Sequence, residues 1–232
     1  PFLLAILVAI VMVAVATLLI ERLTIRPMIN ENFLSIVTIT LGLEFLIANL
    51  SINFFGGRAE SLRIPGDIQF KNFEIGGVRF NWWHVVILIS TFIILAIVGY
   101  IVNRTELGLA MRAFAEDKDA ARLMGIKEST VSQWTWTLSV TVGGLAGILF
   151  APVLFLQQDY MNIPFIKGFV AAILGGFTSL SGGVLGGLLL GELEAFAVKY
   201  APRQAAAALP VIIVFFILLI RPRGLFTRAK AH

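Results

Sequence analysis

Long apolar runs alternate with short polar stretches along this 232-residue chain. Predominantly apolar runs occupy residues 1–20, about 33–55, 82–102 and 132–154. Roughly 20 apolar residues in a helix, at about 1.5 Å rise each, cross a hydrocarbon layer about 30 Å thick. The pattern therefore predicts an all-α, polytopic bundle of transmembrane helices.

Two further apolar tracts lie towards the carboxy end, at 165–200 and 205–220. The first is too long for a single crossing, and the sequence GGFTSLSGG at 175–183 interrupts it. We expect a helical hairpin there, with a short helix, a glycine-rich turn and a second helix to about Tyr200. The whole chain is then expected to make about seven crossings.

The polar stretch at 56–81 contains the pattern of a small β-hairpin. Its centre reads FEIGGVRF, in which apolar residues at every second position flank Gly76-Gly77. A two-residue turn of this kind joins antiparallel strands; an irregular loop with two glycines is the alternative. Trp82, Trp83 and His84 then open the next span, where aromatic side chains favour the membrane interface.

Composition agrees with a membrane protein and removes several other classes. Hydrophobic residues make up 58% of the chain and charged residues 14%, so one water-soluble core cannot bury the apolar surface. The chain has no cysteine, which excludes disulfides, thiolate metal sites and thiol nucleophiles. The net charge of +4 comes from residues scattered between the apolar runs, which argues against nucleic-acid binding.

Basic residues indicate how the chain crosses the membrane. The segment at 103–130 carries five Lys or Arg residues, and the positive-inside rule assigns it to the cytoplasm. The loop at 56–82 is then expected on the periplasmic side. The carboxy end, which is also expected in the cytoplasm, carries Arg221, Arg223, Arg228 and Lys230.

No motif for an enzyme active site occurs in the sequence. A GxxxxGK[ST] phosphate-binding loop is absent, and neither His84 nor His232 has a second ligand at metal spacing. The hydroxyls of GGFTSLSGG have no neighbouring base and do not fit GxSxG. The sequence therefore predicts neither catalysis nor a bound metal or cofactor.

Glu44 is an ionisable residue near the middle of the second apolar run. A charge at the centre of a membrane costs roughly 2.5–3.5 kcal/mol on insertion scales, so it should face protein or water. A polar pathway through the membrane and a protonated glutamate bonded to a neighbouring helix are both compatible with it. The other candidates for such a pathway are Asn49, Thr178, Ser179 and Ser181.

Small residues repeat at helical spacing after the glycine-rich turn. Gly183, Gly187 and Gly191 share one face, with Gly182 and Gly186 beside it. Glycine allows helix backbones to approach where lipid gives no hydrophobic drive. Close helix packing is the expected role of this face, and a role in permeation is the alternative.

The stretch GLAMRAFAEDKDAARLMGI, at 108–126, is alanine-rich and free of proline. Leu107, Met111 and Phe114 fall on one helical face, while Arg112 and Glu116 form an i,i+4 pair on another. We expect one short amphipathic helix. It is either a solvated linker or a surface on which a separate ATP-driven subunit docks.

At this stretch the chain resembles the permeases of branched-chain amino-acid ABC importers, whose cytoplasmic loop carries RA-x-A-x-D followed by AA-x-L-x-GI. ERLTIRP at 21–27, GGFTSLSGG at 175–183 and RPRGLF at 221–226 agree with the same family, so the resemblance spans nearly the whole chain. The matching positions in the loop are Arg112, Ala113, Ala115, Asp117, Ala120, Ala121, Leu123, Gly125 and Ile126.

The resemblance implies a multi-pass subunit of an importer in a bacterial or archaeal inner membrane. Its partners would be a second, homologous permease, cytoplasmic ATP-binding subunits and a periplasmic or extracellular substrate-binding protein. The stretch at 108–126 would be the coupling helix, seated in a groove of the ATPase. The residues expected to contact the ATPase are Arg112, Ala113, Glu116, Asp117, Asp119, Ala120, Ala121 and Gly125.

The implied cargo is a branched-chain or other hydrophobic amino acid. Related permeases move urea, short amides or sugars, and an ion-coupled secondary transporter that uses Glu44 is an alternative of another kind. A structural membrane anchor is a third possibility. Members of the family carry further N-terminal segments with an NFAHG-like motif, so we expect one N-terminally incomplete permease domain at 1–232.

Overall fold

The computed structural model describes residues 2–28, 33–176 and 179–200, with residues 202, 212, 213, 215 and 219. The chain forms two compact units, unit 1 at Pro1–Asp159 and unit 2 at Tyr160–His232. Each unit is considered by itself. The helix expected at 205–220 and the basic tail beyond it fall almost entirely outside the described residues, as does Thr178.

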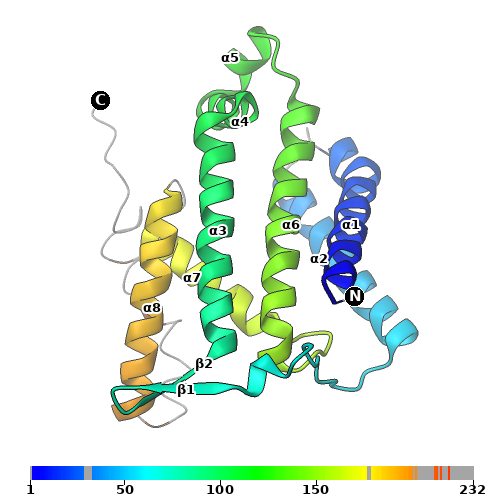
Figure 1. The fold of residues 1–232 in the computed structure, drawn as a ribbon. Coiled ribbons are helices and arrows are strands. Elements are labelled where there is room, and N and C mark those ends of the chain that lie inside the picture. Colours follow the sequence, from blue (N-terminus) through cyan, green and yellow to red (C-terminus); the bar gives the residue numbers. More distant parts are fainter. Residues whose placement is uncertain are drawn as a thin grey trace. The chain divides into compact units, whose positions relative to one another are not determined.

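Helices dominate unit 1, as the apolar runs predicted (Figure 1). The first helix continues beyond its apolar run, because a π-helical turn and a 3-10 turn carry it through ERLTIRP, which was expected to be a connecting segment. The elements of unit 1 are α1 (Phe2–Ile20), η1 (Glu21–Ile25), η2 (Arg26–Met28), α2 (Phe33–Phe55), η3 (Ile68–Phe70), β1 (Asn72–Ile75), β2 (Val78–Asn81), α3 (Trp82–Arg104), α4 (Glu106–Glu116), α5 (Lys118–Leu123) and α6 (Glu128–Leu154).

Five of the described helices are long and apolar enough to cross a membrane. Four belong to unit 1, namely α1 with its η1 extension, α2, α3 and α6, and the fifth is α8 (Leu180–Tyr200) of unit 2. The expected predominantly helical fold with several membrane-spanning helices is thereby confirmed. The count of seven crossings stays a prediction.

Within unit 1, α3 and α6 run side by side (Figure 1). Trp83, at the start of α3, donates its indole N–H to the Leu149 carbonyl of α6 at 3.0 Å. On its other side α6 packs against α1, where a Cβ added to Gly144 would lie 3.3 Å from Val13. The glycine thus permits a close approach of these two helices.

The predicted β-hairpin is present in the 56–82 loop. Strands β1 and β2 pair antiparallel around the Gly76-Gly77 turn, and both glycines have positive φ. Phe73 stacks on its cross-strand partner Phe80, with 5.6 Å between the ring centroids. Asn81 ends the hairpin and caps α3, since its side chain accepts a hydrogen bond from the Trp83 N–H at 2.7 Å.

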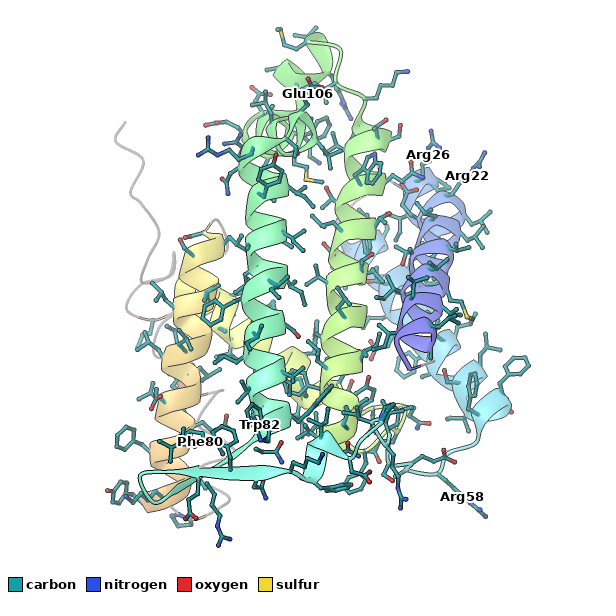
Figure 2. All side chains as sticks on the ribbon, in the orientation of Figure 1. Arg22, Arg26, Arg58, Phe80, Trp82 and Glu106 are labelled. Carbon is teal, nitrogen blue, oxygen red and sulfur yellow. The ribbon has the colours of Figure 1, made fainter. Side chains whose placement is uncertain are left out.

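The two ends of unit 1 differ in their residues. Arg22 and Arg26 lie at the same end as Glu106, whereas Phe80 and Trp82 lie at the opposite end (Figure 2). We call the first of these the basic end. ERLTIRP and the 103–130 segment thus lie at the same end of unit 1, as the predicted topology requires (Figure 2). Which side of a membrane the basic end faces stays a prediction.

Unit 2 contains the expected helical hairpin. Helix α7 (Asn162–Gly175) packs against α8. The 14 residues of α7 span about 21 Å, which is less than the roughly 30 Å of a hydrocarbon layer. The first arm of the hairpin is therefore too short for a full crossing along the membrane normal.

The two helices of unit 2 meet through glycines. A Cβ on Gly182 would lie 2.3 Å from the Gly175 carbonyl oxygen, and one on Gly186 would lie 2.3 Å from the Ala171 carbonyl oxygen. These are backbone atoms, so no side chain can move aside to make room.

The neighbouring face, which was predicted to pack, makes fewer contacts. Gly187 approaches Ala171, at 3.7 Å from an added Cβ, while a Cβ on Gly183 or Gly191 would meet no described atom within 4 Å. The packing role of Gly183, Gly187 and Gly191 stays a prediction.

Candidate functional site

The 103–130 segment forms two helices, α4 and α5, where one was expected. The break falls at Asp117, which has an extended backbone with φ −151° and ψ 110°. Its Oδ1 accepts hydrogen bonds from the backbone N–H groups of Asp119 and Ala120, at 2.9 and 3.0 Å. Aspartate is a favoured N-cap residue, so its side chain stabilises a new helix start in place of a continuous helix.

The start of α4 is held tightly against α3. Thr105 caps α4, because its hydroxyl accepts a hydrogen bond from the Gly108 N–H at 3.1 Å. A Cβ on Gly108 would lie 2.3 Å from the carbonyl oxygens of both Ile101 and Val102. Only glycine therefore allows α4 to begin directly on the last turn of α3.

The end of α5 is a Schellman motif. The N–H of Gly125 bonds to the Arg122 carbonyl at 3.0 Å, and the N–H of Ile126 bonds to the Ala121 carbonyl at 3.1 Å. Gly125 has φ +84°, a conformation that glycine adopts without the penalty of a Cβ. The sequence analysis expected Gly125 to contact the ATPase, and the structure gives it this conformational role.

The inner face of the segment is apolar, which confirms its predicted amphipathic character. Phe114 of α4, Ala121 of α5 and Val131 of α6 form a buried cluster. Met111 and Ile126 pack against it. One small core therefore joins both short helices to a long one.

The outer face carries most of the residues predicted to contact an ATPase. Arg112, Asp119 and Ala120 are exposed, whereas Ala121 is buried and Ala113 is half-buried. Leu123 and Met124 at the tip are 88% and 82% exposed. Sequence reasoning did not assign a contact to Met124, although two apolar residues just before Gly125 break the amphipathic pattern and could have been singled out.

Ionic contacts connect α5 to the start of α6. Arg122 bonds through its guanidinium to Glu128, with Nε at 3.0 Å from Oε2, and reaches Asp119 at 3.4 Å. The hydrogen bond and the charge of Glu128 raise the pKa of Arg122 above its ordinary value. The arginine is thus a fixed positive charge beside the apolar tip.

A second candidate site is a cavity of about 270 Å³ inside unit 1. Glu44 of α2 lines it, and so does Glu21, the first residue of the π-helical turn. Glu21 is 1% exposed, and its Oε1 has no hydrogen-bond partner among the described residues. The full lining comprises Thr17, Ile20, Glu21, Ile25, Thr40, Leu43, Glu44, Ile47, Trp136 and Val140.

The two threonines of this cavity already donate their hydroxyl protons. Thr17 donates to the Val13 carbonyl at 2.7 Å, and Thr40 donates to the Val37 carbonyl at 2.8 Å. Their oxygens keep lone pairs that can accept from a bound group.

Glu21 was missed as a site residue because ERLTIRP was taken as a connecting segment. The sequence did contain a signal: Glu21 follows Thr17 by four residues, on the same face of a helix, and Ile25 extends the helical run.

The other residues predicted for a polar pathway lie elsewhere. Asn49 donates its side-chain N–H to the Phe45 carbonyl at 2.7 Å on its own helix. In unit 2 the Ser179 hydroxyl accepts from the Gly182 N–H at 3.0 Å and lies 3.2 Å from that of Ser181. Ser179 thus acts as an N-cap of α8, and the pathway role of these residues stays a prediction.

Unit 2 also contains an ion pair that sequence reasoning did not identify. Lys167 of α7 donates to Glu194 of α8 at 2.6 Å. Both charges lie in apolar helices, where each would be costly without its partner. A lone lysine within the apolar tract at 165–200, well before Lys199, was the signal that could have found it.

These features together define the class of the molecule. It is an integral membrane protein whose apolar helices carry a compact polar segment at one end and a carboxylate-lined cavity within unit 1. Residues 1–220 match the family described as the permease component of the branched-chain amino acid transport system, and the chain belongs to that family.

Several curated proteins are similar to the chain. The high-affinity branched-chain amino acid transport system permease protein BraD of Pseudomonas aeruginosa is 28% identical, over 92% of this chain and 70% of its own. LivH of Escherichia coli, which has the same description, is 27% identical with the same coverage. The probable permease LivH of Methanocaldococcus jannaschii is 28% identical, over 89% of this chain and 69% of its own. No solved structure matches the chain.

Proposed function

We propose that this chain is the membrane-spanning permease subunit of an ATP-binding-cassette importer for branched-chain or other hydrophobic amino acids. The family assignment supports permease function, and the amphipathic α4–α5 segment supports coupling to a separate ATPase. The chain itself is not expected to catalyse a reaction. ATP hydrolysis belongs to the partner.

The observation that carries the coupling role is the construction of the α4–α5 tip. Capping at Asp117 and the Schellman motif at Gly125 fix the short helix α5, and Leu123 and Met124 project from its end. Exposed apolar side chains on a rigid, otherwise polar support are typical of a protein-binding surface. We place the ATPase contact there, together with the exposed faces of Arg112, Asp119 and Ala120.

The complete importer would contain further subunits. We expect a second permease related to this one and two ATP-binding subunits at the basic end. A substrate-binding protein is expected at the opposite end of unit 1, where the β-hairpin lies. This orientation places the basic end in the cytoplasm of a bacterium or archaeon, in agreement with the positive-inside rule. ATP-driven movement of α5 would then alternate the access of a central cavity to the two sides of the inner membrane.

Purification and reconstitution test this function. The full-length protein, purified from its native membranes, should bring with it an ATPase that has a phosphate-binding loop. Proteoliposomes with the whole complex and its binding protein should then take up leucine only when ATP is supplied on the α4–α5 side. A reproducible absence of any ATPase would refute the proposal.

An ion-coupled secondary transporter is the competing function, and the carboxylates Glu21 and Glu44 are the observation that favours it. Such a protein would move its substrate down an ion gradient with no ATPase present. The same proteoliposomes, prepared without the ATPase and given a proton or sodium gradient, separate the two functions. Competition of labelled leucine by urea, acetamide and fructose in the complete system tests whether the substrate is another small solute.

A further inference from the structure

The cavity of unit 1 offers acceptors for a positive charge. Its polar side-chain oxygens belong to Glu21, Glu44, Thr17 and Thr40, and the described lining residues include no Lys, Arg or His. Both threonine hydroxyls already use their protons on backbone carbonyls. Trp136 adds an aromatic ring, whose face also attracts cations.

Among the described residues, one carboxylate oxygen of Glu21 has no hydrogen-bond partner. A buried ionised carboxylate without a partner costs several kcal/mol, so native proteins pair such groups or protonate them. The Glu21 side chain is almost fully buried, and Oε1 accepts nothing from the part of the chain that is described. Because this oxygen is buried, the Glu21 side chain must turn towards the cavity to accept from an incoming N–H donor.

The backbone at Glu21 is also unusual. The N–H of Arg26 bonds to the carbonyl of Glu21, five residues earlier, which is the spacing of a π-helix. Such turns within α-helices are frequent at functional sites, because they widen the helix and change the direction of a side chain. The π turn lies where α1 continues into the cavity wall.

The remaining walls determine what kind of cation fits. They are hydrocarbon, contributed by Ile20, Ile25, Leu43, Ile47 and Val140. A metal ion such as Ca²⁺ takes six to eight oxygen ligands, which these walls do not provide. The volume of about 270 Å³ lies just below the range of about 300–1,000 Å³ for drug-sized ligands. A small aliphatic ammonium compound fits this cavity, because its ammonium can donate hydrogen bonds to the oxygens and its hydrocarbon part can pack against the apolar walls.

We propose that this cavity binds the ammonium group of a small aliphatic ligand, with Glu21 and Glu44 as its carboxylate partners. The proposal rests on the function proposed above, under which the ligand is the transported hydrophobic amino acid. The ammonium donates to the carboxylate and hydroxyl oxygens, and the aliphatic side chain lies along Ile25, Leu43 and Val140. Since the lining residues that the structure describes include no cation, the carboxylate of the amino acid points out of the cavity.

Three related probes test the chemistry of the site. They are leucine, isoamylamine, which is leucine without its carboxylate, and isocaproate, which is leucine without its ammonium. Binding is measured by calorimetry on the purified complete complex without ATP. Isoamylamine should bind and compete with leucine, and isocaproate should do neither. Displacement of isoamylamine by isocaproate or by sodium ions at equal ionic strength would overturn the proposal.

Substitutions then assign the site to its residues. Glu21→Gln should weaken the binding of leucine and isoamylamine by roughly 10- to 100-fold, since a neutral amide oxygen replaces the charged carboxylate as the acceptor of the ammonium. Glu44→Gln should also weaken the binding of leucine and of isoamylamine. Glu192→Gln is the matched control, because this glutamate of α8 does not line the cavity, and its affinities should equal those of the wild type.

Thr17→Val keeps the shape of the wall and removes one acceptor. It should weaken isoamylamine binding several-fold, which keeps the proposal testable if Glu21→Gln does not assemble. Unchanged isoamylamine affinity in Thr17→Val and in every assembled glutamate variant would overturn the subsite.

ATP-driven uptake separates this proposal from the proposed function. If the wild type takes up leucine but the variants bind leucine and isoamylamine as the wild type does, the ammonium site is refuted and the importer function stands. No uptake of any hydrophobic amino acid by the wild type overturns the importer function, and isoamylamine binding that depends on Glu21 would still support the ammonium site.

Discussion

Asp117 and Gly125 determine where α5 begins and ends. Asp117 caps the first turn through its side chain, and Gly125 closes the last turn through a positive φ. Both positions belong to the motif on which the resemblance to importer permeases was noted. Their local roles give a physical reason for these residue types, independent of any contact with a partner.

Substitution of Asp117 can separate capping from charge. Asp117→Asn retains an N-cap acceptor, whereas Asp117→Ala removes it and should cost the segment about 1 kcal/mol. If capping is the main role, Asp117→Asn keeps near-normal ATPase association and Asp117→Ala weakens it. Association is measured by the amount of ATPase that copurifies from equal amounts of permease. Equal loss in both variants would show that the charge itself contacts the partner.

Gly125→Ala tests the Schellman motif. A residue with a Cβ in this left-handed conformation costs roughly 1–2 kcal/mol, so the end of α5 should fray. Limited proteolysis within the 103–130 segment should be several-fold faster than in the wild type. Gly99→Ala is the control, because Gly99 is helical and a Cβ there meets nothing within 4 Å. Equal cleavage rates in the two variants would contradict the interpretation.

At the scale of elements, short helices are positioned by close backbone contacts and by a few paired polar groups. Gly108 seats α4 on α3, and Gly182 and Gly186 seat α8 on α7. The pair Lys167–Glu194 then fastens the two helices of unit 2 away from the turn. Where lipid surrounds a helix, such contacts replace the hydrophobic drive available in water.

Two neighbouring glycines of α8 should respond differently to the same substitution. Gly186→Ala puts a methyl group against the Ala171 carbonyl and should destabilise the α7–α8 helical hairpin by about 1–3 kcal/mol, as overpacking does. Gly183→Ala meets no described atom and should leave the stability of the isolated subunit unchanged. The melting temperature of the detergent-solubilised subunit distinguishes them. Destabilisation by Gly183→Ala alone would reverse the assignment of the packing face.

At the scale of the whole molecule, the sequence predicted the helices more successfully than the sites. Apolar runs located α2 and α3 within two residues, and Gly76-Gly77 located the hairpin, because both signals are local. The break at Asp117 was missed, since an alanine-rich helical pattern outweighed one capping residue. The cavity was not predictable, because Glu21, Glu44 and Trp136 meet only when distant segments fold together.

Residues 1–232 contain no cysteine, so a single cysteine introduced there can report the orientation. Lys118→Cys lies on α5 at the basic end, and Arg58→Cys lies in the 56–82 loop, where the side chain is exposed. A membrane-impermeant maleimide should label Arg58→Cys in spheroplasts and Lys118→Cys only after permeabilisation. The unsubstituted protein gives the background labelling against which both variants are compared. The opposite labelling would place the α4–α5 segment outside the cell.

The small core of Phe114, Ala121 and Val131 has a mechanical consequence. Because α5 shares this core with α4 and α6, a force applied at Leu123 and Met124 is divided between two long helices. One share reaches α6 through Val131, and the other passes along α4 to Gly108 and the end of α3. A displacement of Leu123 and Met124 is therefore expected to move α3 and α6 together. The stiffness of this core determines how much of that displacement reaches the membrane.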